Sequence, residues 1–173
     1  SSQLQNSPAS SFIRHSEMPQ VEIQSFQFRE HAFEYLDGAE KLHEVHGRAN
    51  LPKYFLACQA IELAIKAYLR LQGRDTKWLK RNIGHDIAKG LSEVRNSGLT
   101  GISPVFHQMV EDLSDIYNDK QFQYFDRSVI SMPGLKKVCS ETRDFLELFR
   151  EDCDRELGGF LKQHFGKPQK VPK

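Results

Sequence analysis

A short stretch in the middle of the chain gathers positive charge. Lys77, Lys80, Arg81 and His85 fall between one apolar segment and the next, beside the expected start of a helix. Cations and the free N–H groups of a helix N-terminus both favour anions, so this stretch predicts contact with a phosphate group or a nucleic-acid backbone. Taken alone, a basic connection of this kind is more typical of a solvated loop.

A second stretch, residues 120–127 of an irregular crossing at 118–133, combines aromatic and basic side chains. It contains Phe122, Tyr124, Phe125 and Arg127. Aromatic rings stack on bases and basic groups contact phosphates, so Tyr124 and Arg127 are outside candidates for binding a ligand. The alternative, more typical of a long loop, is that these rings pin an irregular connection over the end of the core.

The sequence offers little for metal or nucleophilic chemistry. Glu40 and His43 have the Glu-x-x-His spacing of half a di-iron bundle site, but no second pair accompanies them, so no metal is expected. Glu62 and Lys66, four residues apart, are either an ion pair on a helix surface or partly buried groups that fix a partner surface. With no glycine-rich phosphate loop and no Ser/His/Asp set, we expect neither a cofactor nor a catalytic centre.

Helices must position all of these residues, and the clearest one spans residues 54–73. Large apolar side chains cover one side of this segment, alanines line a second, and only a narrow stripe is polar. Such a pattern predicts a central helix that is covered on most of its circumference. Apolar residues at helical spacing predict four more helices, at residues 25–45, 85–97, 104–117 and 133–157. Residues 74–84 are expected to form a polar connection. The expected fold is all-α, an up-and-down bundle of about five helices.

The ends of the chain differ in composition from this bundle. Residues 1–24 are mostly a Ser/Gln/Pro-rich stretch and are expected to form a flexible N-terminal arm. Gly158 and Gly159 are expected to end the last helix, so that the bundle spans residues 25–159. Residues 160–173 then form a Lys/Pro-rich C-terminal tail.

Composition is that of an ordinary globular domain. The chain has 173 residues, of which 39% are hydrophobic and 27% charged, and a net charge of +1 that does not by itself indicate a nucleic-acid binder. Cys58, Cys139 and Cys153 show no CxxC spacing and are expected to be buried, reduced thiols of an intracellular protein. Since there is also no bilayer-spanning apolar run and no signal peptide, we expect a cytoplasmic protein without membrane contact.

Two motifs together resemble the HEPN superfamily of small helical bundles. The first is the helix that reads YFLACQAIELAIKAYLRLQG, and the second is Gly84-His85-Asp86, about a dozen residues after it. The resemblance covers about residues 25–157 and includes the order of the helices. The positions that match in the first motif are Ala57, Gln59, Ala60, Glu62, Leu63, Lys66, Ala67 and Leu69.

This resemblance implies several properties. Members are four-to-five-helix bundles that often form homodimers, and many act beside a nucleotidyltransferase in toxin–antitoxin or defence systems. Others are metal-independent endoribonucleases, which carry an Arg and a His separated by four to six residues. Here Arg81 and His85 come closest to that spacing but have only three residues between them.

The sequence therefore favours a non-catalytic, dimerising module that binds a nucleotide, RNA or a partner protein such as a nucleotidyltransferase. Lys80, Arg81 and His85 are the expected anion-binding residues. One alternative is a metal-independent endoribonuclease that uses Arg81 and His85. Another is a purely structural helical dimer.

Overall fold

The computed structural model of the chain describes residues 22–46, 51–119 and 132–166. Within these ranges it contains seven helices and no strand, which confirms the predicted all-α class. The helices are α1 (Ser25–His46), α2 (Leu51–Leu71), α3 (Thr76–Asn82), α4 (Ile87–Asn96), α5 (Pro104–Asn118), α7 (Leu135–Glu147) and α8 (Arg150–Phe165).

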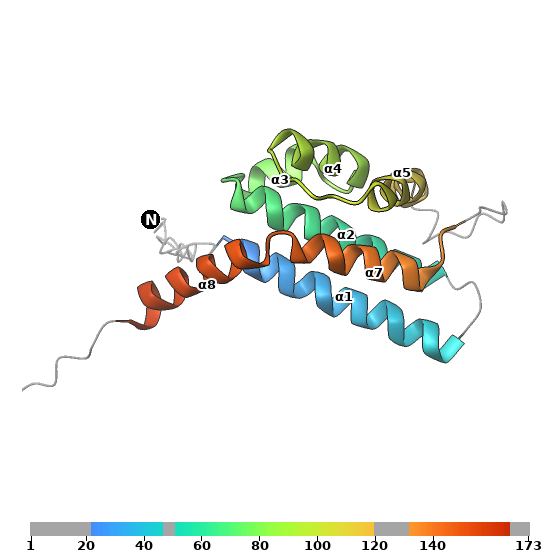
Figure 1. Ribbon diagram of the computed structural model, residues 1–173, viewed down its shortest axis with the longest axis horizontal. Coiled ribbons are helices and arrows are strands. Elements are labelled where there is room, and N and C mark those ends of the chain that lie inside the picture. The colour runs from blue at the N-terminus through green and yellow to red at the C-terminus, as the bar shows by residue number, and fades with distance from the viewer. Residues whose placement is uncertain (1–21, 47–50, 120–131, 167–173) are drawn as a thin grey trace, which may run out of the picture.

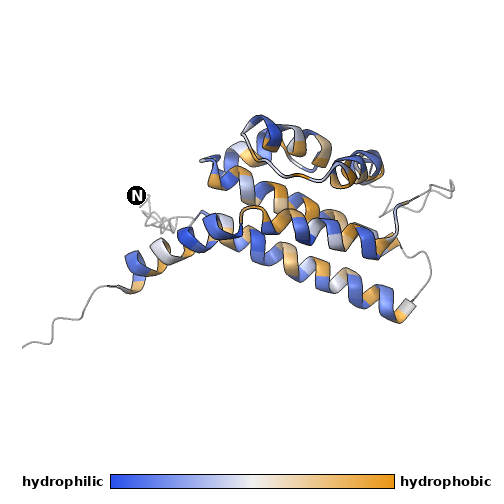
Figure 2. Cartoon of the chain, viewed as in Figure 1, coloured by the Kyte–Doolittle hydropathy of each residue, from blue (hydrophilic) through white to orange (hydrophobic). Residues whose placement is uncertain are grey.

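Helix α2 lies at the centre of the bundle (Figure 1). Helix α1 runs antiparallel to α2, and α7 lies alongside both on one side. On its other side α2 packs against the layer formed by α3, α4 and α5. Hydrophobic residues recur along the helices, interrupted by hydrophilic ones (Figure 2), as expected of amphipathic helices that share one core.

The predicted central helix is confirmed by its burial. Ile61, Ile65 and Leu69 are fully buried, and the alanines at positions 57, 60, 64 and 67 have no exposed surface either. Small side chains allow the neighbouring helices to approach α2 closely, while the large ones fill the space between them. The helix is followed by Gly73, whose positive φ of 85° is a conformation that favours glycine.

The predicted polar connection at residues 74–84 contains a helix, α3. Its N-cap is Asp75, whose carboxylate accepts a hydrogen bond of 2.6 Å from the backbone N–H of Trp78. Leu79 is buried and anchors the helix to the core, and the guanidinium of Arg74 lies 4.5 Å from the centre of the Trp78 ring. A side-chain cap and the apolar residues Trp78, Leu79 and Ile83 thus hold two turns of helix in an otherwise polar segment.

The predicted last helix is two helices. Phe149 leaves helical geometry with φ −128° and ψ 21°, and its buried ring contacts those of Tyr68 and Phe145. Helix α8 then passes through Gly158 and Gly159, so the helix end predicted there is wrong. Two glycines cost a helix only about 1 kcal/mol each, and this does not stop it.

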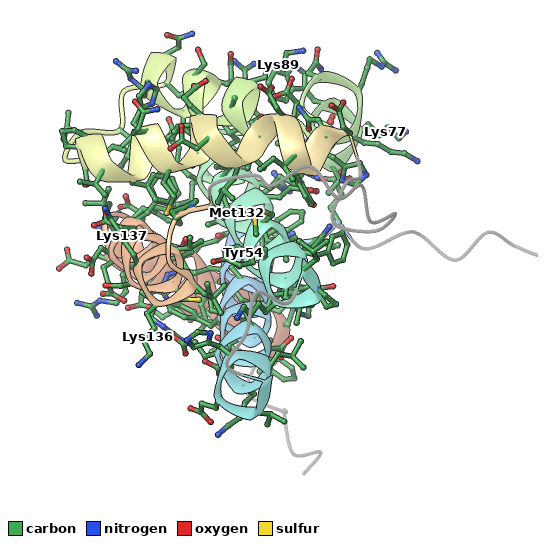
Figure 3. All side chains as sticks on the ribbon, turned by 90° about the vertical axis from the view of Figure 1, so that its right-hand side faces the viewer. Tyr54, Lys77, Lys89, Met132, Lys136 and Lys137 are labelled. Atoms are coloured by element: carbon green, nitrogen blue, oxygen red, sulfur yellow. The ribbon has the colours of Figure 1, made fainter. Side chains whose placement is uncertain are left out.

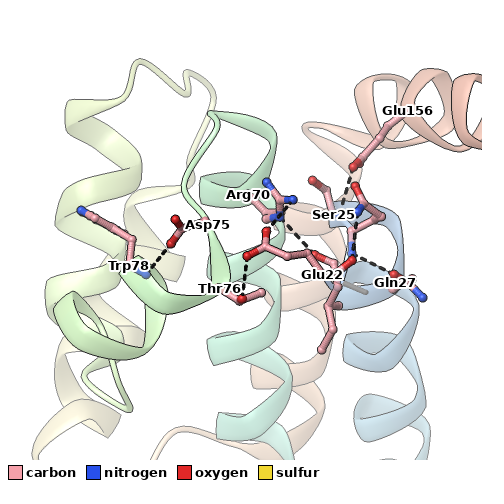
Figure 4. Close-up of polar contacts among 10 residues, drawn as sticks. Glu22, Ser25, Gln27, Arg70, Asp75, Thr76, Trp78 and Glu156 are labelled. Carbon is pink, nitrogen blue, oxygen red and sulfur yellow. Dashed lines mark hydrogen bonds and ion pairs between the residues drawn. The ribbon is translucent and has the colours of Figure 1, made fainter. Parts of the chain in front are cut away.

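Residues 22–24, predicted as part of a flexible arm, are held against the bundle (Figure 4). The carboxylate of Glu22 contacts Arg70 and Thr76, each at 3.0 Å, and Arg70 also donates to the carbonyl oxygen of Ile23. The backbone N–H of Ser25, at the start of α1, donates to Glu156 of α8. The rest of the predicted arm, and the tail after residue 166, lie outside the described residues.

The three cysteines are buried and form no disulfide, as predicted. Burial raises the pKa of the Cys139 and Cys153 thiols to about 12, and it also raises that of Cys58. Over the described ranges, no helix combines the length and the apolar character needed to cross a bilayer.

Candidate functional site

A carboxylate lies buried where α2, α5 and the turn between α3 and α4 meet. The side chain of Glu62 is only 5% exposed, and it accepts hydrogen bonds from three groups. Lys66, one turn further along α2, contacts one oxygen at 2.5 Å. The other oxygen lies 2.6 Å from the Tyr117 hydroxyl and 2.9 Å from Nδ1 of His85. A buried carboxylate needs such donors because burial without them would be very costly.

The Gly84-His85-Asp86 motif builds the turn that brings the imidazole to Glu62. Gly84 has φ 57°, a backbone conformation that other residues rarely adopt. Asp86 is the N-cap of α4, and its carboxylate accepts a 2.9 Å hydrogen bond from the backbone N–H of Lys89. Between them, His85 contacts Glu62. The three residues thus have three different structural tasks.

His85 is held on one side and exposed on the other. Its side chain is 71% exposed, although Nδ1 is bound to a buried group. A neutral imidazole can donate to the carboxylate only if Nδ1 carries the hydrogen, which leaves a lone pair on Nε2. Glu62 therefore orients an imidazole that can accept a proton or a hydrogen bond from a ligand.

Tyr117 completes the polar cluster from α5. Its hydroxyl donates to Glu62 and accepts from the side-chain amide of Gln59. Burial, followed by the charge of Glu62, raises the pKa of this hydroxyl, so that it remains a donor at any physiological pH. The ring of Tyr117 packs against Phe55 and faces that of His85 edge-on.

Four exposed basic residues precede and follow this turn in the chain. Lys77, Lys80 and Arg81 stand at i, i+3 and i+4 on α3 and are exposed, as is Lys89 on α4. Within the described ranges, no ion pair or side-chain hydrogen bond engages any of these four cations. Figure 3 shows Lys77 and Lys89 in the layer of α3 and α4, well away from Lys136 and Lys137 of α7. We call Lys77, Lys80, Arg81, His85 and Lys89 the α3–α4 corner.

The structure places the residues singled out from the sequence as follows. Lys80, Arg81 and His85 lie within one helix and the turn after it. Two of the N–H groups at the start of α4, expected to be free for an anion, have acceptors: that of Lys89 donates to Asp86 and that of Ala88 to the Ser114 hydroxyl. Tyr124 and Arg127 lie outside the described residues.

Glu62 and Lys66 are an ion pair in which Glu62 is buried and the Lys66 side chain is 13% exposed. The sequence does not predict that Tyr117 and Gln59 join the hydrogen bonds around Glu62. Tyr117 ends the apolar stripe of α5, which made it look like a core residue, and Gln59 lies one turn before Glu62 on the narrow polar stripe of α2. A polar residue on that narrow stripe is the sequence feature that could have indicated a partly buried hydrogen bond at Gln59.

Glu40 and His43, which have the spacing of half a di-iron site, contact basic side chains instead of each other. Glu40 pairs with Arg143 at 2.8 Å, and the ring of His43 lies 3.0 Å from the Lys53 ammonium. No group of three or more His, Cys, Asp or Glu side chains within the described ranges is arranged to hold a metal ion.

Comparison with known proteins is consistent with the architecture and the motifs. The searches of curated proteins and of solved structures find no significant match. The family model of the HEPN domain matches residues 27–156, which include every residue of the Glu62 cluster and the α3–α4 corner. The chain therefore belongs to the HEPN domain family.

Proposed function

We propose that this HEPN module binds RNA or a nucleotide through phosphate contacts at the α3–α4 corner, that it does so as a homodimer, and that it does not cleave its ligand. A nucleotidyltransferase, as part of a toxin–antitoxin or defence system, is the alternative partner for the same surface. The observation that carries the proposal is the exposed His85, held by a buried carboxylate, beside cations that pair with no carboxylate in the described ranges.

The charges of the rest of the molecule support this choice of surface. Arg29, Arg70, Arg74, Arg143 and Arg155 each pair with a carboxylate. The cations of the α3–α4 corner extend into solvent without such a partner in the described structure. Arg95, Lys136, Lys137 and Lys162 are likewise exposed without an ion pair there, but only the corner adds the imidazole that Glu62 holds. Unpaired cations on one face attract phosphate, and each phosphate contact releases a counterion.

The Glu62–His85 pair also favours a second candidate, a metal-independent endoribonuclease. In that reaction Nε2 of His85 accepts the proton of a ribose 2′-hydroxyl, whose oxygen attacks the adjacent phosphorus. The bond from phosphorus to the 5′-oxygen breaks, which leaves a 2′,3′-cyclic phosphate on one fragment and a 5′-hydroxyl, protonated by the imidazolium or by water, on the other. Arg81 stabilises the negative charge that develops on the phosphate. The carboxylate of Glu62 keeps the imidazole oriented and offsets the positive charge that it gains.

Binding of a fluorescent single-stranded RNA to the full-length chain, measured by polarisation over a salt series, tests the proposal. A Lys80→Ala/Arg81→Ala variant is expected to bind at least about tenfold more weakly, and to lower the salt slope by roughly 1.4. The matched control is Lys136→Ala/Lys137→Ala, an exposed basic pair on α7, which should bind as the wild type does.

The same RNA, run on a gel after incubation, separates the two candidates. Intact RNA in the presence of bound protein supports the binding module. Cleavage that is lost in both Arg81→Ala and His85→Ala would establish the nuclease instead. Equal binding by the two double variants would rule out the α3–α4 corner as the site.

A further inference from the structure

The second half of α8 extends beyond the rest of the bundle (Figure 1). Cys153, in the first half, is the one buried residue of this helix. After Gly159, the ring of Phe160 contacts the ring of Phe26 in α1, and the two ring centres are 5.5 Å apart. Leu161 and Phe165 are 45% and 77% exposed. Hydrophobic residues therefore continue to the end of the helix (Figure 2) without a described neighbour to cover them.

The glycine pair in the middle of α8 has no explanation within the described part of the chain. A Cβ atom added to Gly158 or Gly159 would meet no other atom within 4 Å. Alanine at either position would stabilise the helix by about 1 kcal/mol. Glycine at an open position in a helix does, however, let the backbone of another helix come close.

One face of α8 is self-complementary across this pair. Asp154, Gly158, Leu161 and Phe165 follow one another at spacings of four, three and four, so they share a face. The exposed Phe165 lies at one end of that face. Near the other end a pocket of about 390 Å³ opens between α1 and α8; among its lining residues are Phe26, Arg29, Cys153, Asp154 and Leu157.

The charges of α8 also favour pairing with a second, antiparallel α8. Its first half carries Glu151, Asp152, Asp154 and Glu156 against two arginines. After the glycine pair it carries Lys162 and His164 and no acidic residue. Antiparallel pairing of two such helices sets the acidic half of each against the basic half of the other.

We propose that two copies of the chain pair through antiparallel α8 helices, with Gly158 and Gly159 at the two-fold axis. Phe165 of each copy enters the α1–α8 pocket of the other, as a symmetric interface requires. This inference rests on the homodimer of the proposed function and names its interface.

Sedimentation of the full-length chain over a range of concentrations tests the interface. The wild type is expected to be a dimer, and Phe165→Glu should raise the dissociation constant at least about 30-fold. Since Phe165 is exposed, the substitution should leave the circular dichroism of the fold unchanged. The control is Val45→Glu, near the end of α1 and 72% exposed, which should remain dimeric.

A cysteine at the two-fold axis gives an independent measurement. Gly158→Cys should form a disulfide-linked dimer on mild oxidation, because the native cysteines are buried, whereas Lys89→Cys on α4 should not. If Phe165→Glu still forms a dimer and Gly158→Cys forms no disulfide-linked dimer, the α8 interface is wrong. The homodimer of the proposed function would then still hold, through another surface. A wild type that is monomeric throughout would overturn both, while the RNA measurement would still test the α3–α4 corner.

Discussion

Two charged clusters flank the central helix, and they differ in burial. On the side of α4 and α5, Glu62 is 5% exposed and its contacts include a lysine, a histidine and a tyrosine. On the side of α1 and α7, Arg143 joins Asp37 and Glu40 at 2.8 Å each, but these carboxylates are 69% and 39% exposed. Both clusters pair carboxylates with nitrogen donors at 2.5–2.9 Å, and solvent access separates them.

Solvent access also decides how much each cluster contributes to stability. Exposed ion pairs contribute little because water and salt screen them, whereas a buried charge that loses its partners is costly. The Arg143 cluster ties two helices together at the surface. The Glu62 cluster connects the core to the exposed imidazole of His85. A change in the charge of Glu62 should therefore alter the orientation and hydrogen bonding of that imidazole.

Glu62→Ala is expected to have the largest effect. It leaves Lys66 without its carboxylate in a mostly buried position, and the free energy of unfolding should fall by about 3–5 kcal/mol. Urea denaturation measures the loss. Glu40→Ala is the matched control on the other side of α2 and should cost under about 1 kcal/mol; equal losses would contradict the comparison.

Gly90→Ala tests the packing of the same side of α2. A Cβ at Gly90 would lie 2.8 Å from a methyl group of Ile65 and 3.1 Å from one of Ile83. Such overpacking should lower the free energy of unfolding by about 1–3 kcal/mol. Gly38→Ala in α1, where the nearest atom is 3.5 Å away on Leu56, should be neutral or stabilising by up to about 1 kcal/mol. Thermal denaturation of both variants would decide, and the reverse order would be inconsistent with this packing.

Tyr117→Phe should cost about 1 kcal/mol at neutral pH, because one hydrogen bond to Glu62 is lost. The raised pKa of Tyr117 adds a signature at high pH. Below pH 10, near the ordinary tyrosine pKa, its contribution to stability is fully present, and it is lost as the pH rises towards the folded-state value. Denaturation between pH 9 and 11 should therefore show a shallower fall for the variant, and parallel curves would argue against burial of the hydroxyl.

Arg143→Ala is expected to have the smallest effect. Its ion pairs are half-exposed, so their loss should change the free energy of unfolding by under about 1 kcal/mol, and by less still in high salt. Urea denaturation at low and high salt measures this. A loss as large as that of Glu62→Ala would show that exposure does not distinguish the clusters.

Much of the fold could be predicted from apolar spacing, and little of the site could. The sequence of α2 predicts a covered helix because its polar stripe is narrow, and the structure confirms it. Helix α3 was missed because seven mostly polar residues show no period, and the end of α8 was missed because glycine was taken as a stop. Glu62 and His85 are 23 residues apart, and their contact depends on the turn at Gly84, which no local pattern reveals.

The position of the hydrogen on the His85 ring shows whether Glu62 orients the imidazole. The nitrogen chemical shifts of that ring, recorded at a pH where imidazole is ordinarily neutral, distinguish the two tautomers. With Glu62 buried against it, His85 should carry its hydrogen on Nδ1 and leave Nε2 bare, and Glu62→Gln should abolish that preference. A hydrogen on Nε2 in the wild type, unchanged in Glu62→Gln, would show that Glu62 does not orient the imidazole.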